Sequence, residues 1–216
     1  MTGAGTKRAS SNETTSIGLP DISRQAVEFT SYSCGMPTRQ RFFAFIRAIN
    51  VGGRRLSNDE LVEPFTRLGL EDVAAYQAAG NITFRTDSLN AVRAERLEPV
   101  LAAAYGFDAV TFVRDIDEMH AIVNAEPFAE DELAQTEGRV QVALLREAPD
   151  EVMTADVRAL VPTDDRIEFV GNQWFWLPKR GVSDSQLPVR STEEILGPMT
   201  IRTLGTLSRM LAKFGG

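Results

Sequence analysis

Residues 41–55 read Arg41-Phe42-Phe43-Ala44-Phe45-Ile46-Arg47-Ala48-Ile49-Asn50-Val51-Gly52-Gly53-Arg54-Arg55. The apolar run over 42–46 is short and rich in aromatic residues, which predicts a buried strand over about 41–47. The two adjacent glycines can adopt positive φ, so they favour a tight turn directly after this strand. Ser57-Asn58-Asp59-Glu60 has the spacing of a capping box, which predicts a helix that runs to Leu68. A strand, a glycine turn and a helix therefore open the fold.

The pattern continues through the rest of the first half. We expect strands over 73–77 and 81–85, a helix that Ser88 caps and Gly106 ends, and a strand over 109–114. The apolar face expected for that helix consists of Leu89, Val92, Leu97, Val100 and Leu101. The resulting order, β-α-β-β-α-β, is the split βαβ arrangement of a ferredoxin-like sheet.

The second half repeats this theme. A capping box at Asp115 predicts a helix to about residue 123, and Gly171-Asn172 predicts a hairpin turn. The remaining expected elements are strands over 139–146, 167–170 and 174–177, and helices over 150–160, 192–196 and 204–214. We therefore predict an α+β protein with two ferredoxin-like subdomains packed together, 40–114 and 115–216. One continuous sheet is the alternative.

Residues 1–39 are predicted to form a leader outside this fold. The segment 1–35 is rich in Ser, Thr and Gly and poor in apolar residues, which predicts disorder. Met36 stands just before the first strand, so we interpret it as the start of the protein or the leader as a dispensable tail. A partner-binding arm is the alternative.

Composition limits the classes of function. The chain has 216 residues, 43% hydrophobic and 25% charged, which is typical of a soluble globular protein. No apolar run approaches the roughly 20 residues of a membrane span, and the N-terminal residues lack the apolar core typical of a secretory signal, so we predict a cytoplasmic address. The single cysteine, Cys34, excludes an internal disulfide framework. We predict no cofactor and no metal.

Charge is unevenly distributed along the chain. The net charge is −7, and residues 115–168 carry fifteen acidic groups against four basic ones. Because such a segment repels a phosphate backbone, broad nucleic-acid binding is disfavoured. A small anion held by a local group of arginines remains compatible with this distribution.

Several motifs together resemble the bacterial family known as domain of unknown function 1697. Residues 47–53 match its Arg-Gly-Ile-Asn-Val-Gly-Gly motif except at Ala48. Residues 75–82 follow its Thr-Tyr-Ile-Gln-Ser-Gly-Asn-Val motif with one residue fewer between Tyr76 and Gln77 and with Ala79 in place of the serine. The segments 124–128, 181–183 and 200–206 resemble its later motifs, with Thr203 in place of an asparagine. The resemblance implies two ferredoxin-like halves over about 40–214. It implies no reaction.

The main candidate site is a pocket for a phosphate or carboxylate group at the first turn. Arginine forks and backbone amides suit such an anion, and Lys179 and Arg180 form a basic loop that could close over it. The predicted pocket consists of Arg47, Asn50, Gly52, Gly53, Arg54 and Arg202. The alternatives are a structural turn and a solvated loop. We expect the bend at 77–81 to lie at the opposite end of the sheet.

Two other functions stay open from the sequence. One is an enzyme acting on a phosphorylated or nucleotide-like substrate, for which Tyr76 or a carboxylate would have to act as the base. The other is nucleic-acid binding through Trp174 and Trp176 on one strand face, although core packing is the favoured interpretation of these aromatics. His120 stands alone and predicts neither a triad nor a metal site. The sequence does not identify the ligand or the oligomeric state.

Overall fold

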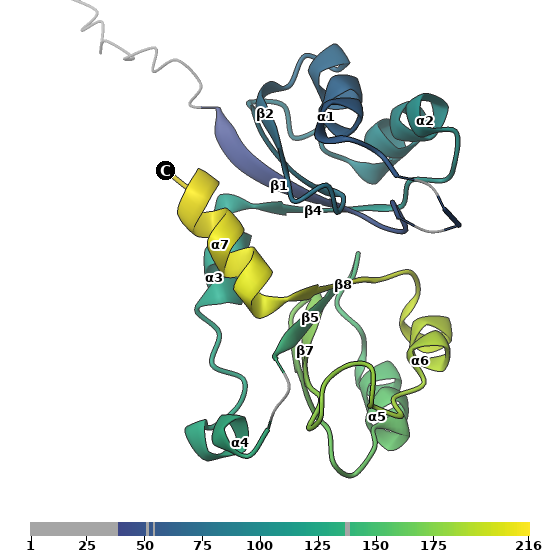
Figure 1. The fold of residues 1–216 in the computed structure, drawn as a ribbon, viewed down its shortest axis with the longest axis vertical. Helices are drawn as coiled ribbons and strands as arrows, with labels where there is room; N and C mark the ends of the chain where they lie inside the picture. Colours follow the sequence, from purple (N-terminus) through teal and green to yellow (C-terminus); the bar gives the residue numbers. More distant parts are fainter. Residues whose placement is uncertain (1–38, 51, 54, 137–138) are drawn as a thin grey trace, which may run out of the picture. The chain divides into compact units, whose positions relative to one another are not determined.

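The strands form two four-stranded antiparallel sheets in a computed structural model, which describes residues 39–216 except 51, 54, 137 and 138 (Figure 1). Residues 1–38, which include almost all of the predicted leader, lie outside the described residues, and residues 37–216 form one compact unit. The first sheet has the order β2-β3-β1-β4 and the second β6-β7-β5-β8. The mixed α+β prediction with two sheets is confirmed.

Each sheet is built from one β-α-β-β-α-β unit. The first contains β1 (Gln40–Ile46), α1 (Asn58–Arg67), β2 (Glu71–Tyr76), β3 (Asn81–Thr86), α2 (Ala94–Tyr105) and β4 (Thr111–Asp115). The second contains β5 (Gln141–Leu144), α5 (Glu151–Leu160), β6 (Arg166–Val170), β7 (Gln173–Leu177), α6 (Val189–Leu196) and β8 (Thr200–Thr203). Each unit is followed directly by a further helix, α3 (Ile116–Val123) or α7 (Leu204–Phe214).

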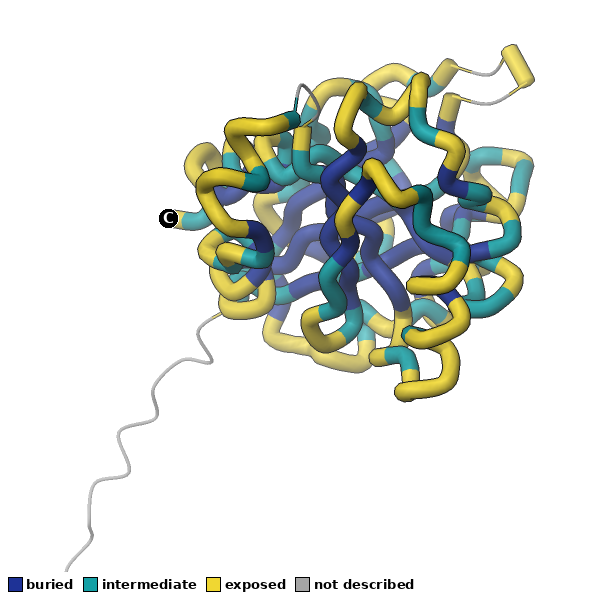
Figure 2. Tube along the Cα trace, turned by 90° about the horizontal axis from the view of Figure 1, so that it is seen from below, coloured by how far each residue is buried: buried dark blue, intermediate teal, exposed yellow. Residues whose placement is uncertain are grey.

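The strands β1 and β7, which lie inside their sheets, are buried on both faces. In β1, Phe42 and Ala44 pack with α1 and α2, whereas Phe43 and Phe45 lie on the opposite face, because side chains alternate along a strand. In the second sheet, Trp174 and Trp176 pack in the outer cluster with residues of α5 and α6. The continuous apolar runs in these strands therefore reflect burial on two sides (Figure 2).

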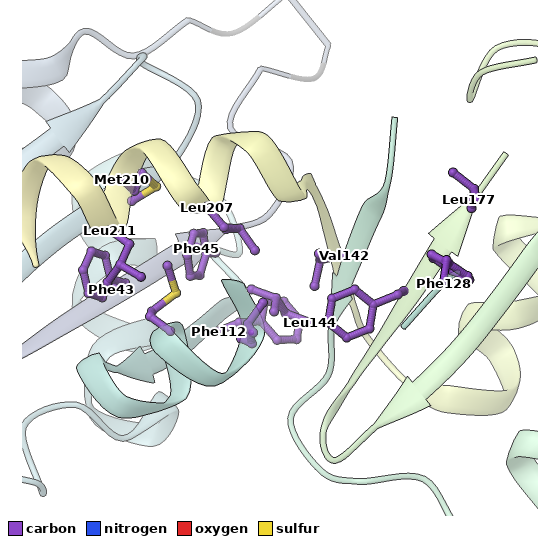
Figure 3. Close-up of a cluster of buried hydrophobic side chains, with 13 residues drawn as sticks. Phe43, Phe45, Phe112, Phe128, Val142, Leu144, Leu177, Leu207, Met210 and Leu211 are labelled. Carbon is purple, nitrogen blue, oxygen red and sulfur yellow. The ribbon is translucent and has the colours of Figure 1, made fainter. Parts of the chain in front are cut away.

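A central cluster of buried side chains joins the two sheets. It combines the inner faces of both sheets with α3, α7 and Phe128, and Figure 3 shows α7 side chains beside β1 side chains. The cluster consists of Phe43, Phe45, Phe112, Met119, Ile122, Phe128, Val142, Leu144, Phe175, Leu177, Leu207, Met210 and Leu211. This cluster contains residues from both sides of the boundary predicted after residue 114. The boundary itself stays a prediction.

Helix starts follow their local sequence closely. Ser57 and Asp115 each form the predicted capping box, and Asp150 and Thr203 cap α5 and α7 with their side chains.

The prediction that Ser88 caps a long helix was wrong. Residues 89–92 form turns, α2 begins only after Arg93, and no side chain caps it.

Two elements were missed, and both are short. The strand β8 has only four residues, of the pattern Thr-Ile-Arg-Thr, and it pairs with β5 alone. The helix α4 (Glu130–Ala134) is five residues long and has no buried residue. Neither segment carries an apolar period long enough to be recognised from sequence.

Candidate functional site: two reciprocal arginine junctions

The turn after β1 and the bend between β2 and β3 lie side by side. The backbone N–H of Ile46 donates to the carbonyl of Gly80 at 2.7 Å, and the Asn50 amide donates to the carbonyl of Ala78 at 3.2 Å. Our expectation that they lie at opposite ends was wrong. Because β1 and β3 are antiparallel neighbours, the end of β1 lies beside the start of β3, with Phe45 opposite Asn81.

Arg202, on β8 of the second sheet, reaches both segments of the first sheet. Its Nε donates to Asn81 Oδ1 at 2.6 Å, and its Nη2 donates to the carbonyls of Ile46 (3.1 Å) and Ala79 (3.2 Å). Its Nη1 donates to Thr200 Oγ1 and to the carbonyl of Ile201, both at 2.8 Å. Burial lowers the pKa of Arg202 to about 10. All of these acceptors belong to the protein itself.

Arg47 forms a second connection between the halves. Its guanidinium forms a bidentate ion pair with Glu193 of α6, with Nη2 and Oε2 at 2.8 Å. Of the other predicted pocket residues, Gly52 and Gly53 are exposed with φ of 70° and 80°. Arg54 lies outside the described residues. We define Arg47, Arg202, Glu193 and Asn81 as the first junction.

A second set of contacts also joins the two halves, here through Arg114 of the first half and Arg146 of the second. Neither arginine was predicted as a site residue. Arg114 of β4 donates through Nη2 to the carbonyls of Leu145 (2.8 Å), just after β5, and Asn172 (3.0 Å), in the turn between β6 and β7. Arg146 pairs with Glu98 of α2 at 2.5 Å. Arg114, Arg146 and Glu98 define the second junction.

The two junctions occupy corresponding places in the repeated fold. Arg47 and Arg146 each follow the first strand of their half. Arg114 and Arg202 each precede the N-cap residue of the helix that follows their sheet. The sequence contains a signal for this repetition, since Ile46-Arg47 corresponds to Leu145-Arg146. The repetition points to Arg114 and Arg146 only when β8 is also recognised as the counterpart of β4.

The two junctions differ in whether the Nε–H group of the arginine that reaches the other half has a hydrogen-bond acceptor. Whereas Arg202 Nε has Asn81 as acceptor, Arg114 Nε is buried and has no hydrogen-bond partner among the described residues. Arg114 is only 3% exposed, and burial lowers the pKa of its guanidinium while Glu118 and Asp115 act in the opposite direction. A buried guanidinium N–H without an acceptor is costly.

A cavity of about 380 Å³ lies at the second junction. Arg93, Arg114 and Arg146 line it, together with the uncapped start of α2 at Ala94 and Glu95. Glu95 and Glu147 also contribute to the lining. The cavity thus brings three guanidinium groups and a helix N-terminus, which favours negative charge, into one place.

Lys179 and Arg180 lie at a different position in the second sheet. Lys179 pairs with Asp164 at 3.7 Å, and its backbone N–H donates to Asp165 Oδ1 at 3.2 Å. These contacts place the loop beside the start of β6, which is the edge strand opposite β8. Within the described part of the chain, no hydrogen bond or ion pair joins Lys179 or Arg180 to the first junction, so the role of this loop as a lid stays a prediction.

The aromatic strand is part of the core. Trp174, Phe175 and Trp176 are each no more than 1% exposed, so core packing is confirmed and an exposed base-stacking platform on this strand is excluded. His120 is exposed on α3. Among the described residues, no group of three or more His, Cys, Asp or Glu is placed to hold a metal ion. No helix in the same residues has the length and apolarity to cross a membrane.

The motifs at 47–53 and 75–82, which lie side by side at the first junction, fall within the part of the chain that matches a known protein family. Residues 39–175 match the family described as Protein of unknown function (DUF1697). The chain belongs to the DUF1697 family. No curated protein matches this DUF1697 chain.

Comparison with solved structures supports the fold. The conserved bacterial protein SP0830 from Streptococcus pneumoniae superposes with a TM-score of 0.62 at 24% identity, covering 82% of this chain and 99% of that one. An unknown protein from Galdieria sulphuraria has a TM-score of 0.20 at 16% identity, over 82% of this chain and 94% of its own. The first likeness concerns the fold alone.

The two ion pairs should contribute little stability individually. Since the Arg47 and Glu193 side chains are 39% and 22% exposed, we expect a coupling free energy of about 0.5 to 1 kcal/mol in a double-mutant cycle with Arg47→Ala and Glu193→Ala. The cycle with Arg146→Ala and Glu98→Ala should give a similar value, measured by urea unfolding. A coupling above about 3 kcal/mol in either cycle would show that the pairs hold the halves together.

Proposed function

We propose that this DUF1697 protein is a binding module for a small anionic ligand that carries a phosphate or carboxylate group, with the cavity at the second junction as its site. One observation carries the proposal. The uncapped start of α2 and the side chains of Arg93, Arg114 and Arg146 line the same cavity of about 380 Å³. Guanidinium forks and free helix amides are the groups that recognise such anions.

The three arginines that line the cavity differ in how freely each could contact a ligand. Arg93 is exposed and has no ion pair among the described residues, so it is free to contact a ligand. Arg146 is held by Glu98, whose Oε1 also accepts from the Thr111 backbone N–H at 2.7 Å. A ligand that contacts Arg146 therefore shares it with Glu98. Arg114 lies in the wall of the cavity, where it adds positive charge.

The first junction is the weaker candidate for the same function. Each of the Arg202 donor groups already has an acceptor within the protein, and Arg47 is engaged by Glu193. An anion there would have to displace backbone carbonyls, which would remain buried without donors. The exposed Asn50, Gly52 and Gly53 keep the turn itself accessible, so the first junction serves as the comparison in the test.

The test is a thermal-shift and calorimetric titration of the full chain with inorganic phosphate and with succinate. We expect Arg93→Ala and Arg146→Ala each to weaken binding by about tenfold or more, since a hydrogen bond to a charged group contributes roughly 1.5 to 3 kcal/mol. Arg96→Ala, which removes the same charge from an exposed position of α2 outside the cavity lining, should leave binding unchanged.

Three outcomes would overturn the assignment. Binding that is lost in Arg47→Ala and kept in Arg146→Ala would move the site to the first turn. Equal losses in Arg96→Ala and Arg93→Ala would show nonspecific attraction. No binding of either anion at millimolar concentration would remove the proposed function.

The subdomain boundaries at 40–114 and 115–216, each half with a ferredoxin-like fold, are part of this proposal. The same strand order in both sheets supports it. A ligand at the second junction would contact both halves, because Arg93 and Arg114 precede residue 115 and Arg146 follows it.

A further inference from the structure

A second cavity, of about 570 Å³, lies at the end of the central core and is separate from the second junction. The segment between α3 and α4 forms one wall of this cavity, and α4, Val140 and the start of α7 at Leu204 form the others. Its volume falls in the range of small-molecule sites. None of its lining residues belongs to the arginine-lined cavity, so the following inference does not depend on the proposed function.

Most of the residues that line this cavity are of apolar type, although polar atoms also face it. Phe128, which is 7% exposed, belongs to both the cavity lining and the central cluster, and Figure 3 shows it beside Leu177 at the end of that cluster. Leu133 of α4 also lines the cavity and is 42% exposed, although leucine side chains are usually buried. An apolar group placed between Phe128 and Leu133 would therefore remove exposed apolar surface from water.

The polar part of the lining has one sign of charge. Glu126 and Glu130 are the two charged residues that line the cavity, and both are exposed. Within the described part of the chain, neither carboxylate has a hydrogen bond or an ion pair. Both lie in the segment 115–168, which carries fifteen acidic groups and four basic ones. This excess attracts cations and repels anions.

We propose that this cavity binds a small organic cation with an apolar body, such as a primary aryl- or alkylamine. The apolar body packs between Phe128 and Leu133, and the ammonium group lies near Glu126 and Glu130. Apolar burial supplies the affinity, while the two carboxylates supply the discrimination by charge. The ligands proposed for this cavity and for the arginine-lined cavity are therefore of opposite charge.

The experiment compares two probes of similar apolar body and opposite charge, 2-phenylethylamine and 3-phenylpropanoate, by calorimetric titration of the full chain. We expect the amine to bind at least tenfold more tightly than the carboxylate at low ionic strength. The preference should shrink in 0.5 M NaCl, because salt screens exposed charges.

Two variants separate the contributions of charge and apolar contact. The double variant Glu126→Gln and Glu130→Gln should lower amine affinity about tenfold and remove the preference over the carboxylate. Leu133→Ser should weaken both probes, whereas Val152→Ser, which changes an exposed valine on α5 outside the cavity, should weaken neither. Since Leu133 and Val152 are exposed at 42% and 69%, both variants should fold.

Several results would overturn the inference. They are equal affinity for the two probes, amine binding that survives both variants, or no amine binding at millimolar concentration.

Discussion

The Arg202→Met variant should lose roughly 3 to 5 kcal/mol of unfolding free energy, the largest effect expected at either junction. Methionine fills similar space but donates no hydrogen bond, so the carbonyls of Ile46 and Ala79 and the Asn81 amide oxygen lose their donor. These groups lie where the two halves meet and have limited access to water. Urea unfolding followed by tryptophan fluorescence measures the loss, because Trp174 and Trp176 report on the second sheet.

The Arg202→Lys variant is the matched control for charge. Lysine keeps the positive charge but presents one ammonium group, which cannot reach the five acceptors that the planar guanidinium contacts. We expect it to recover less than half of the stability lost in Arg202→Met. Full recovery would show that charge alone, and not the geometry of the fork, stabilises the junction.

The Gly80→Ala variant should lose roughly 3 kcal/mol, the second largest effect expected. Gly80 has a φ of 70°, which disfavours a side chain. In addition, an added Cβ would lie 2.6 Å from the carbonyl oxygen of Ile46 and 2.7 Å from Ile49 Cγ1. The bend must therefore move away from β1, which also lengthens the hydrogen bond from the Ile46 N–H to the Gly80 carbonyl.

Gly69→Ala separates backbone strain from this close approach. Gly69 has a φ of 77°, and an added Cβ there meets nothing within 4 Å. Its loss should be about 1 kcal/mol, the cost of the left-handed conformation alone. If Gly80→Ala and Gly69→Ala unfold at the same urea concentration, the contact between the bend and β1 is not tight enough to matter.

Much of the secondary structure could be predicted because its causes are local. The capping boxes at Ser57 and Asp115 satisfy helix amides with side chains three residues away, and Gly171-Asn172 forms the hairpin turn between β6 and β7. The prediction failed where local signals were weak or misleading. Ser88 has the chemistry of a cap, yet Leu89 next to it is 66% exposed and the helix starts later.

The candidate site could be predicted only in part. The sequence brought Arg47 and Arg202 together as candidates, and both do lie at the first junction. It did not show that the first half supplies the acceptors for Arg202 Nε and Nη2, because these acceptors lie between 121 and 156 residues away: the Asn81 side-chain oxygen and the carbonyls of Ile46 and Ala79. It also did not select Arg114 or Arg146, since a single arginine after a strand carries no local signal.

The sequence by itself determined the α+β class, the order of most elements and the start of several helices, since short-range hydrogen bonding and apolar periodicity fix these features. The tertiary structure alone decided which acceptors each arginine contacts, and that Arg93, Arg114 and Arg146 line one cavity. That outcome depends on antiparallel pairing, which sets the end of β1 beside the start of β3, and on the packing of one sheet against the other. Both are contacts between residues far apart in the chain, and no local pattern encodes them.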